Sequence, residues 1–576
     1  MLLTSLCAQV NGMPCHANAE LNAALRETFG FGKGLCASDA GDVSGVAGYR
    51  VAKDQTHAGA LSLLSGMDQD LEYPGAFAKV PDMLAQGLVN MSDVDRAVGN
   101  VLRQKFAAGL FDNNETLLYV DATRHDAVVG AAAHRKLAQT VAEEGITLLK
   151  NDNLRLPLVG LGSTIKTIAV VGPNADNAHS HLGIYGTDDP KGGVRTLLNA
   201  TLAAANASDN KWIVKYEKGS CLGGTPGCPC NSDWDGDNQS VHDFDPNWMN
   251  QPIADYAMPC DVGFTGRIPF AVKLAKEADV TLLVIGDMST LSTNTGFTPY
   301  VREVATVGEH FDRDNLDPAG AQLDLMKAVV SASKNVIIVL IHGRTVTFGA
   351  GPGDGYNQAF TDAAAVLAAW HPGEEGGAAL WNILSGAVNP SGRTAHTWPR
   401  SVGQVHQYVP WYLEQKTRPS STHYADYAPA TPLVPFGFGL SYSNYTFSNV
   451  NICAGPPCKE DKEDKVSTVA AADTWNVSLD ITNHGTMDGK IVVQIYFSQN
   501  LASRVRFSKM LLAFGKIFVK AGQTLKGVEV AVKAQDLEMW QTKANKYTVE
   551  ASTYSIMVGQ SSVDKHTVSH TMHVTA

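Results

Sequence analysis

The sequence contains no long apolar run and no excess of basic residues. A membrane-spanning helix needs about 18 consecutive apolar residues, whereas the longest apolar runs here, such as Val336 to Ile341, have the length of buried strands. Basic residues number 45 against 57 acidic ones, which leaves a formal net charge of −12. Because nucleic-acid binding generally requires a basic face, we expect neither a membrane nor a nucleic acid among the partners.

Signatures of metal and phosphate binding are also missing. The sequence has neither a glycine-rich phosphate loop nor two histidines at metal-ligand spacing. The close cysteine pairs Cys228/Cys230 and Cys453/Cys458 lack a matching second half with His or Cys, which disfavours zinc. The sequence therefore predicts no cofactor and no metal.

The composition is that of a folded protein with several domains. Apolar residues make up 44% of the 576 residues and charged residues 18%, which excludes a disordered chain and a coiled coil. At about 100–200 residues per domain, this length predicts three or four domains.

The cysteines indicate an oxidising compartment. Close pairs on irregular loops, as at 221–230 and 453–458, suit disulfides, although the total of nine leaves at least one thiol free or paired outside the chain. Seven Asn-x-Ser/Thr sequons agree with a secreted glycoprotein: Asn90, Asn114, Asn199, Asn206, Asn238, Asn444 and Asn476. Residues 1–6 lack the features of a signal peptide, so we expect the natural start to lie upstream.

Two α/β regions and one all-β region follow one another along the chain. Helical patterns at 19–29, 55–66 and 92–111 surround a short strand at 34–38. A second region has helices at 131–144 and 319–331, strands at 146–149, 168–171, 280–285 and 336–341, and a long insertion at 205–262. Segments 475–481, 491–497, 528–532 and 547–549 predict an antiparallel sandwich of about 120 residues.

Asp39 is the first candidate for chemistry. It stands at the carboxyl end of an apolar strand and is followed by Ala40 and Gly41, which is where α/β proteins place ligands. A carboxylate in that position can act as a nucleophile, a general base or a metal ligand. The alternative is that Asp39 caps the following helix.

An ordered set of short blocks resembles family 3 glycoside hydrolases and covers nearly the whole chain. Residues 10–39, ending in Ala37-Ser38-Asp39, resemble the nucleophile region of that family. The other blocks, in order, begin at Leu102, Glu144, Ala169, Trp370, Asn389, Pro399 and Pro435. Each block alone is weak, but their shared order is specific.

The resemblance implies an α/β plus all-β fold. Residues 1–115 would form the C-terminal part of a (β/α)8-type catalytic barrel, and 130–400 the α/β sandwich domain of the family. Residues 401–445 would be a linker, and 446–576 a fibronectin type III-like domain. Only residues 1–33 precede the strand before Asp39, so most of the barrel is expected to be missing from this sequence and the chain alone to be impaired.

The resemblance also implies hydrolysis of terminal β-linked sugars with retention of configuration, in a cleft between the first two domains. Asp39 would be the nucleophile and Glu309 the acid/base, with Glu303 as the alternative, because retaining chemistry needs two carboxyl groups about 5–5.5 Å apart. A surface ion pair of Glu309 with Arg313 is the other interpretation of that residue. The substrate would be an oligosaccharide or glycoside.

Other residues near these blocks have simpler interpretations. Asp42 and Asp68 could line the sugar site, although turn capping is the expected role of each, and His371 is expected to be structural. Asp312 and Arg313 are expected to shape their loop through an internal ion pair.

Departures from the family pattern bear on the substrate. Ala40 stands where many family glucosidases have Trp and xylosidase-like members often have Cys, and the cysteine-bearing loop after Tyr216 resembles the xylosidase-like branch. We therefore favour an exo-β-xylosidase or an arabinosidase-like relative over a β-glucosidase. The alternative function is that of a non-catalytic carbohydrate-binding relative, suggested by the missing barrel half.

Overall fold

The computed structural model divides the chain into two compact units, Met1–Val128 and Val129–Ala576. It describes residues 9–72, 74–112, 122–158, 165–184, 193–207, 212–220, 267–289, 306–308, 313–349, 357–405, 432–454, 466–470, 474–507, 509–563 and 568–575. Within these ranges, none of the helices is long and apolar enough to cross a membrane.

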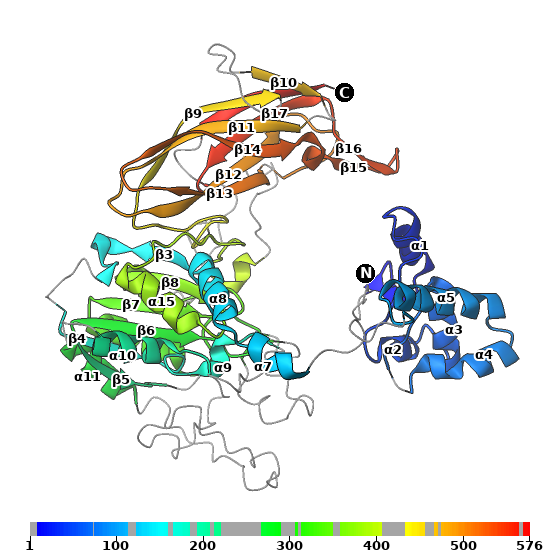
Figure 1. Ribbon diagram of the computed structural model, residues 1–576, viewed down its shortest axis with the longest axis horizontal. Helices are drawn as coiled ribbons and strands as arrows, with labels where there is room; N and C mark the ends of the chain where they lie inside the picture. Colours follow the sequence, from blue (N-terminus) through cyan, green and yellow to red (C-terminus); the bar gives the residue numbers. More distant parts are fainter. Residues whose placement is uncertain are drawn as a thin grey trace, which may run out of the picture. The chain divides into compact units, whose positions relative to one another are not determined.

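The first unit consists mainly of helices (Figure 1). It begins with a two-stranded hairpin, β1 (Gln9–Val10) and β2 (Met13–Pro14), followed by a 3-10 turn, η1 (Cys15–Ala17). Its helices and further turns are α1 (Ala19–Glu27), α2 (Asp42–Gly48), α3 (Gln55–Ser65), η2 (Ala76–Lys79), α4 (Val80–Ala85), α5 (Met91–Ala107), η3 (Ala122–Arg124) and α7 (His125–Val128). A small core forms where α3, α4 and α5 meet, around Leu63, Met83 and Ala97.

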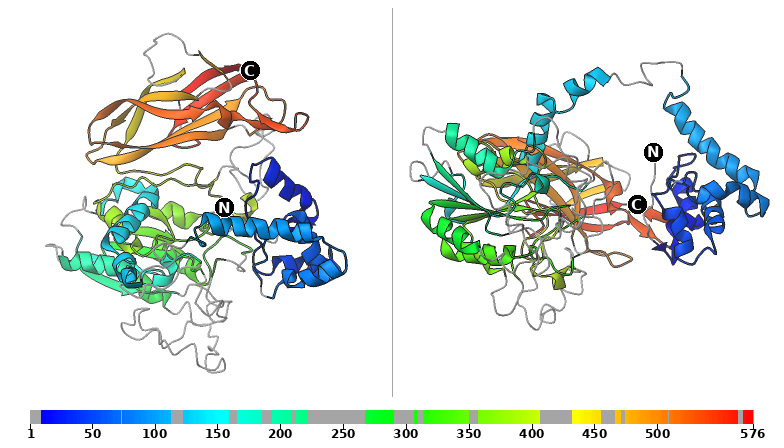
Figure 2. Two further views of the ribbon diagram at one scale, coloured as in Figure 1. Left: turned by 45° about the vertical axis from the view of Figure 1, so that its right-hand side comes forward. Right: turned by 90° about the horizontal axis from the view of Figure 1, so that it is seen from below.

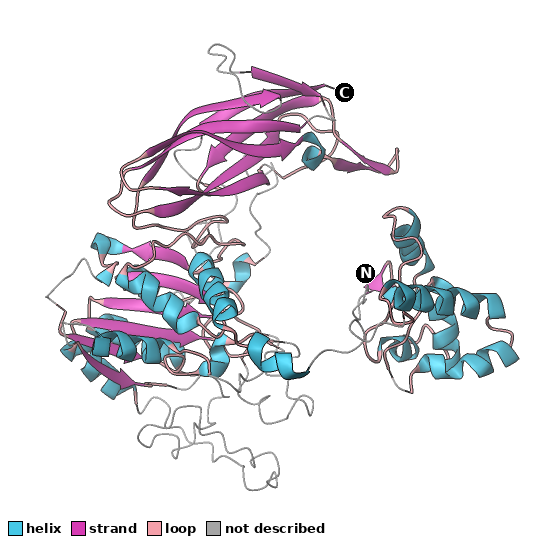
Figure 3. Cartoon of the chain, viewed as in Figure 1, coloured by secondary structure: helices cyan, strands magenta, loops and turns pink. Residues whose placement is uncertain are grey.

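A six-stranded sheet organises the first part of the second unit (Figure 3). Its spatial order is β3-β8-β7-β6-β4-β5, and all neighbours are parallel except β3 and β8. The strands are β3 (Thr147–Asn151), β4 (Thr167–Val171), β5 (Ile213–Glu217), β6 (Val280–Gly286), β7 (Val336–Ile341) and β8 (Ala365–Trp370). Every residue of β6 and β7 is buried, as expected for central parallel strands covered on both faces.

Helices cover both faces of this sheet (Figures 1 and 2). The core on one face packs against α8 (Ala132–Gly145), α10 (Leu197–Ala207) and α15 (Gly376–Ser385). The core on the other face packs against α11 (Ile268–Glu277), α13 (Gln322–Ala332) and α14 (Gln358–Asp362). Shorter elements are η4 (Asp152–Leu154), α9 (Ala178–His181) and η11 (Val402–Gln404).

The C-terminal part of the second unit is a β-sandwich of a five-stranded sheet, β10-β18-β17-β12-β13, and a three-stranded sheet, β14-β11-β9. Trp475 and Ile495 are fully buried between the two sheets. The strands are β9 (Tyr445–Ala454), β10 (Val466–Ala470), β11 (Thr474–Asn483), β12 (Gly489–Gln499), β13 (Met510–Val519), β14 (Thr524–Lys533), β17 (Ser552–Gly559) and β18 (Val568–Thr575). A turn, η12 (Ala534–Leu537), precedes the hairpin of β15 (Met539–Gln541) and β16 (Lys546–Thr548).

Polar contacts join the sandwich to the α/β part. Glu144, near the end of α8, accepts hydrogen bonds from Lys490 on β12 and Lys516 on β13. The Asn389 amide, in the loop after α15, donates to Ser443 Oγ at 3.0 Å, just before β9. These contacts place the start of β3 directly beside the sandwich.

The predicted α/β plus all-β class is confirmed, with two local corrections. The strand expected at 34–38 is reduced to an isolated bridge between Ala37 and Gln69, because the described residues offer it a single short neighbour. Residues 213–217, predicted as part of an insertion, form the edge strand β5, since the parallel pairing with β4 overrides their polar pattern. The rest of the predicted insertion lies largely outside the described residues.

Removing a buried side chain from β8 should destabilise the second unit far more than removing an exposed one from α8. Leu367 is 0% exposed between the helical layers, whereas Leu137 is 63% exposed. We expect Leu367→Ala to lower the free energy of unfolding by about 2–5 kcal/mol and Leu137→Ala by less than about 0.5 kcal/mol. Urea unfolding followed by circular dichroism measures both, and equal losses would contradict the described packing.

Candidate functional site

Asp39 follows the point where two chain segments of the first unit run parallel. Ala37 bridges Gln69, and the Ser38 amide donates to the Gln69 carbonyl at 2.9 Å. The half-buried Asp39 carboxylate comes directly after this pairing, and its Oδ1 accepts a hydrogen bond from the Ala40 amide at 2.7 Å. Asp39 therefore lies at the carboxyl end of a short parallel pair. The pairing fixes the backbone before Asp39 and not the backbone after it.

The alternative role of Asp39 as a helix cap is wrong. Helix α2 begins at Asp42, and its N-cap is Gly41, which has φ 80° and supplies no side chain. That left-handed conformation is easily adopted only by glycine, so Gly41 turns the chain between Asp39 and the helix. Among the described residues, none forms an ion pair with Asp39 and none donates to its Oδ2. The carboxylate is consequently available for chemistry.

Asp68 has a structural role, and a different one from the predicted turn cap. Its side chain is 0% exposed and forms ion pairs with Arg26 and Arg96, each at 2.7 Å. It also accepts hydrogen bonds from the Asn100 side chain and the Cys36 amide, both at 3.0 Å. A buried carboxylate with these four donors is fully occupied, and it fixes α1 and α5 to the segment around Cys36 that leads to Asp39.

Asp42 is also buried and paired. It lies in the first turn of α2, where a negative charge is favoured by the helix dipole, and its Oδ2 is 3.3 Å from His16 Nε2. The predicted capping role is replaced by this contact with His16, which ties α2 to η1.

A polar cluster lies in the second unit, beyond the carboxyl ends of β6 and β7. Asp287 directly follows β6, is fully buried, and contacts Arg344 Nη2 at 3.1 Å. Thr306 Oγ1 donates to the same carboxylate oxygen of Asp287 at 3.1 Å. Burial raises the pKa of Asp287, while the guanidinium of Arg344 acts in the opposite direction.

The predicted acid/base candidates Glu309 and Glu303 both lie outside the described residues, as does Asp312. The described residues nearest to Glu309 are Thr306–Gly308 and, on the other side, Arg313. Val307 forms a bridge with Ser289, so the chain returns beside the end of β6 immediately before Glu309.

Histidines surround the same edge of the sheet. His342 and His181 are fully buried, and burial lowers the pKa of His342 to about 3 and that of His181 to about 4. His371 Nδ1 lies 2.8 Å from the Ser180 carbonyl oxygen, a contact compatible with the predicted structural role. Trp370, the last residue of β8, has φ 59°, an uncommon conformation for a bulky residue that sharply turns the chain just before His371.

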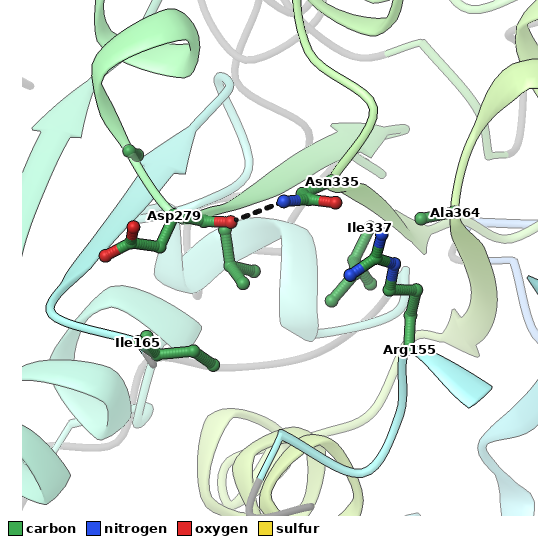
Figure 4. A pocket seen from close by; sticks show the side chains of 8 residues that line it. Arg155, Ile165, Asp279, Asn335, Ile337 and Ala364 are labelled. Atoms are coloured by element: carbon green, nitrogen blue, oxygen red, sulfur yellow. Dashed lines mark hydrogen bonds between the residues drawn. The ribbon is translucent and has the colours of Figure 1, made fainter. Parts of the chain in front are cut away.

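A pocket of about 310 Å³ lies at the opposite edge of the sheet (Figure 4). Its walls come from residues at the amino ends of the strands, among them Asp279, Asn335 and Ile337, and from Arg155 after η4. The Asp279 carboxylate accepts hydrogen bonds from the amides of Lys166 and Thr167, at 2.7 and 2.8 Å, and so serves the backbone. Because open α/β sheets bind ligands beyond their carboxyl ends, this pocket is on the wrong edge for the site.

Within the described ranges, no group of three or more His, Cys, Asp or Glu side chains is placed to hold a metal ion.

Comparison with known proteins identifies the family. The family described as "Glycosyl hydrolase family 3 C-terminal domain" matches residues 146–442, which is more than half of the chain. The chain belongs to glycosyl hydrolase family 3. A fibronectin type III-like domain matches residues 491–562, within the sandwich.

Two named relatives of this family 3 chain are a β-xylosidase and a β-glucosidase. A β-xylosidase of Formosa agariphila is 32% identical over 98% of the chain and 68% of its own length. A periplasmic β-glucosidase of Salmonella typhimurium is 30% identical over 96% of the chain and 65% of its own length. Among solved structures, a β-glucosidase from Erythrobacter marinus covers 100% of the chain with a TM-score of 0.80 and 29% identity, and the chain covers 67% of it.

These relationships confirm the predicted family and its glycosidase class, while xylosidase and glucosidase names occur at nearly equal identity. The chain spans about two thirds of the length of these relatives, 68% and 65%. The roles of Asp39 and Glu309 stay predictions.

Neutralising Asp68 should destabilise the first unit, whereas neutralising Asp39 should not. Asp68→Asn leaves Arg26 and Arg96 without their buried partner, so we expect a loss of about 3–5 kcal/mol in the free energy of unfolding. Asp39→Asn breaks no ion pair among the described residues and should change it by less than about 0.5 kcal/mol. Thermal unfolding of both variants tests this, and a large loss in Asp39→Asn would show that Asp39 is structural.

Buried His342 should make the second unit sensitive to acid. Its pKa is about 3 in the folded chain and 6.5 ordinarily, so between these values the unfolded chain binds the extra proton. Stability therefore falls as the pH decreases through this window, by up to about 1.4 kcal/mol per pH unit. His342→Gln should reduce the slope of unfolding free energy between about pH 6 and about pH 4 by up to that amount. An unchanged slope in urea titrations would contradict the burial of a neutral imidazole.

Proposed function

We propose that this chain hydrolyses terminal non-reducing β-linked sugars with retention of configuration. The observation that carries the proposal is the Asp39 carboxylate, which stands at the end of a parallel pair and is used neither by a helix nor by an ion pair of the described residues. The membership in glycosyl hydrolase family 3 and the β-xylosidase and β-glucosidase names of its relatives support it.

The proposed reaction has two displacements. In the first, Asp39 attacks the anomeric carbon and forms a covalent glycosyl-enzyme, while Glu309 protonates the oxygen of the departing group. In the second, Glu309 takes a proton from water, whose oxygen attacks the anomeric carbon and releases Asp39. The product keeps the β configuration because each displacement inverts it once.

The Asp39 environment suits a nucleophile. The Ala40 amide fixes Oδ1 at 2.7 Å, which orients the carboxylate and leaves Oδ2 free of donors from the described residues. Asp68, which accepts a hydrogen bond from the Cys36 amide three residues before Asp39, has its charge balanced by Arg26 and Arg96 and so is not available as the nucleophile. Glu303 is the second candidate for the acid/base.

We further propose a preference for β-xylosides and a secreted location. The small Ala40 beside Asp39 and the cysteine-bearing segment after Tyr216 support the xylosidase-like branch. Cys453 is disulfide-bonded, with its partner outside the described residues, and disulfides persist in oxidising compartments. One relative is named as periplasmic.

Mechanism-based labelling tests the assignment of Asp39. A 2-deoxy-2-fluoro-β-xyloside with an activated leaving group should attach to Asp39 and be located there by peptide mass spectrometry. Asp39→Asn should lower turnover of an aryl β-xyloside by at least about 10³-fold. As a matched control, Asp54→Asn replaces the exposed N-cap of α3 with another good capping residue and should leave turnover unchanged.

Three outcomes distinguish the alternatives. Labelling of another carboxylate would overturn the role of Asp39. Measured turnover of β-xylosides or β-glucosides by the unaltered chain would instead rule out the non-catalytic carbohydrate-binding relative. Faster turnover of β-glucosides would overturn only the proposed sugar preference.

A further inference from the structure

Ser38, the residue before Asp39, is fully buried and joins the chain at this point to a neighbouring segment of the first unit. Its Oγ accepts a hydrogen bond from the Leu71 amide at 3.2 Å and donates to Asp70 Oδ1 at 3.4 Å. The Ser38 amide donates to the Gln69 carbonyl at 2.9 Å. Three contacts from one residue therefore fix the backbone immediately before Asp39.

The Asp70 carboxylate, which accepts from Ser38, is itself held by the turn that follows it. Its Oδ1 also accepts from the Glu72 amide, and its Oδ2 accepts from the Phe77 amide, both at 3.2 Å. The turn closes tightly around this carboxylate, because a Cβ on Gly75 would lie 2.2 Å from Asp70 Oδ2 and 2.7 Å from the Glu72 carbonyl oxygen. The Ser38 hydroxyl thus donates to a group whose place is already fixed.

The earlier part of this pairing is anchored without the Ser38 side chain. The amides of Asp68 and Gln69 donate to the Cys36 carbonyl at 2.8 and 3.2 Å. The Cys36 amide donates in return to the Asp68 carboxylate at 3.0 Å. Loss of the Ser38 hydroxyl should therefore loosen the chain only at the end of the pairing, next to Asp39.

The backbone after Asp39 is held by less than the backbone before it. Gly41 turns the chain there with φ 80°, and glycine restricts the backbone less than any other residue. The Asp39 carbonyl accepts a single hydrogen bond, from the Asp42 amide at 3.4 Å, within the described part of the chain. The direction in which the Asp39 side chain leaves the backbone consequently depends mainly on Ser38.

We propose that Ser38 is a positioning residue for Asp39. This rests on the proposed function, in which the Asp39 carboxylate attacks the anomeric carbon. The amide of Ser38 sets the end of the parallel pairing, and its hydroxyl fixes that end to Asp70 and Leu71. A displacement of about 1 Å in a reacting group can cost about 10²-fold in rate.

The test compares Ser38→Ala with Ser65→Ala, both in the full chain. Ser65, at the end of α3, is a second buried serine of the first unit. Its Oγ lies within hydrogen-bonding distance of the Ser62 and His16 carbonyls and accepts from the Asn22 side chain at 3.2 Å. Among the described residues, these hydrogen bonds reach neither the chain around Asp39 nor the segment opposite it. The control therefore removes a buried hydroxyl of similar connectivity away from Asp39.

The decisive readout is the rate constant with which a 2-deoxy-2-fluoro-β-xyloside labels Asp39, separated from the fraction of chains that become labelled. Ser38→Ala should lower the rate constant at saturating label by about 10²-fold. The final labelled fraction and the label concentration for half-maximal rate should change less than about threefold. Ser65→Ala should leave the rate constant unchanged.

A smaller labelled fraction with an unchanged rate constant in Ser38→Ala would overturn the proposal. That result is expected when a substitution only reduces the number of folded molecules, because each molecule that remains folded still reacts at the original rate. An equal fall of the rate constant in Ser65→Ala would also overturn it, since the effect would then not depend on contact with Asp39.

Amide hydrogen exchange gives a second measurement that needs no activity. In Ser38→Ala, exchange of the amides at positions 38 and 71 should increase at least about tenfold, while the amides of Asp68 and Gln69 stay protected as in the unaltered chain. Unchanged exchange at position 38 would overturn the positioning role even if the labelling rate changed. If the unaltered chain were neither labelled nor active, the proposed function would fail, and the exchange result would still decide whether Ser38 fixes the backbone at Asp39.

Discussion

Burial of β6 and β7 on both faces is the constraint on which the α/β part of the second unit depends. Two strands made almost entirely of branched apolar residues cannot face water on either side, so helices must cover both faces. With both faces occupied, the chain can present polar groups only at the strand ends. The carboxyl ends carry Asp287, Thr306 and Arg344, and the segments adjoining Glu309 are attached there.

The two units solve the problem of buried carboxylates in related ways. Asp68 and Asp287 both lose contact with water, which is tolerated because arginines lie against them. Each of these pairs joins segments distant in sequence and so fixes the backbone near a candidate catalytic residue. Asp39 differs from both, since among the described residues a single backbone amide, that of Ala40, donates to its carboxylate. The carboxylates of Asp68 and Asp287 are paired with arginines and have structural roles, whereas the carboxylate of Asp39 has no such pair among the described residues and is the candidate for catalysis.

Sequence patterns predicted the secondary structure correctly where that structure depends mainly on consecutive residues. The β-branched runs of β6 and β7, the helical periodicity of α5 and the turn-rich alternation of the sandwich were predictable, because burial and periodicity are written in consecutive residues. The strand β8 was not expected, since its alanine-rich sequence is equally typical of a helix, and only its position between β3 and β7 makes it a strand. The roles of Asp68 and Arg344 were likewise hidden, because their partners lie tens of residues away. The resemblance to the family identified Asp39 as a candidate. It could not show that the N-cap of α2 is Gly41 and not Asp39.

The contacts of Glu144 have a consequence for how this architecture can change. Its carboxylate is shared by lysines on two strands of the sandwich, while its own helix leads directly into β3 of the α/β sheet. Deleting or exchanging the sandwich would leave Glu144 without both lysines and expose the beginning of β3. The sandwich is therefore less a detachable module than a support for one edge of the neighbouring sheet. Shuffling it between relatives would require the helix end and the two lysines to be inherited together.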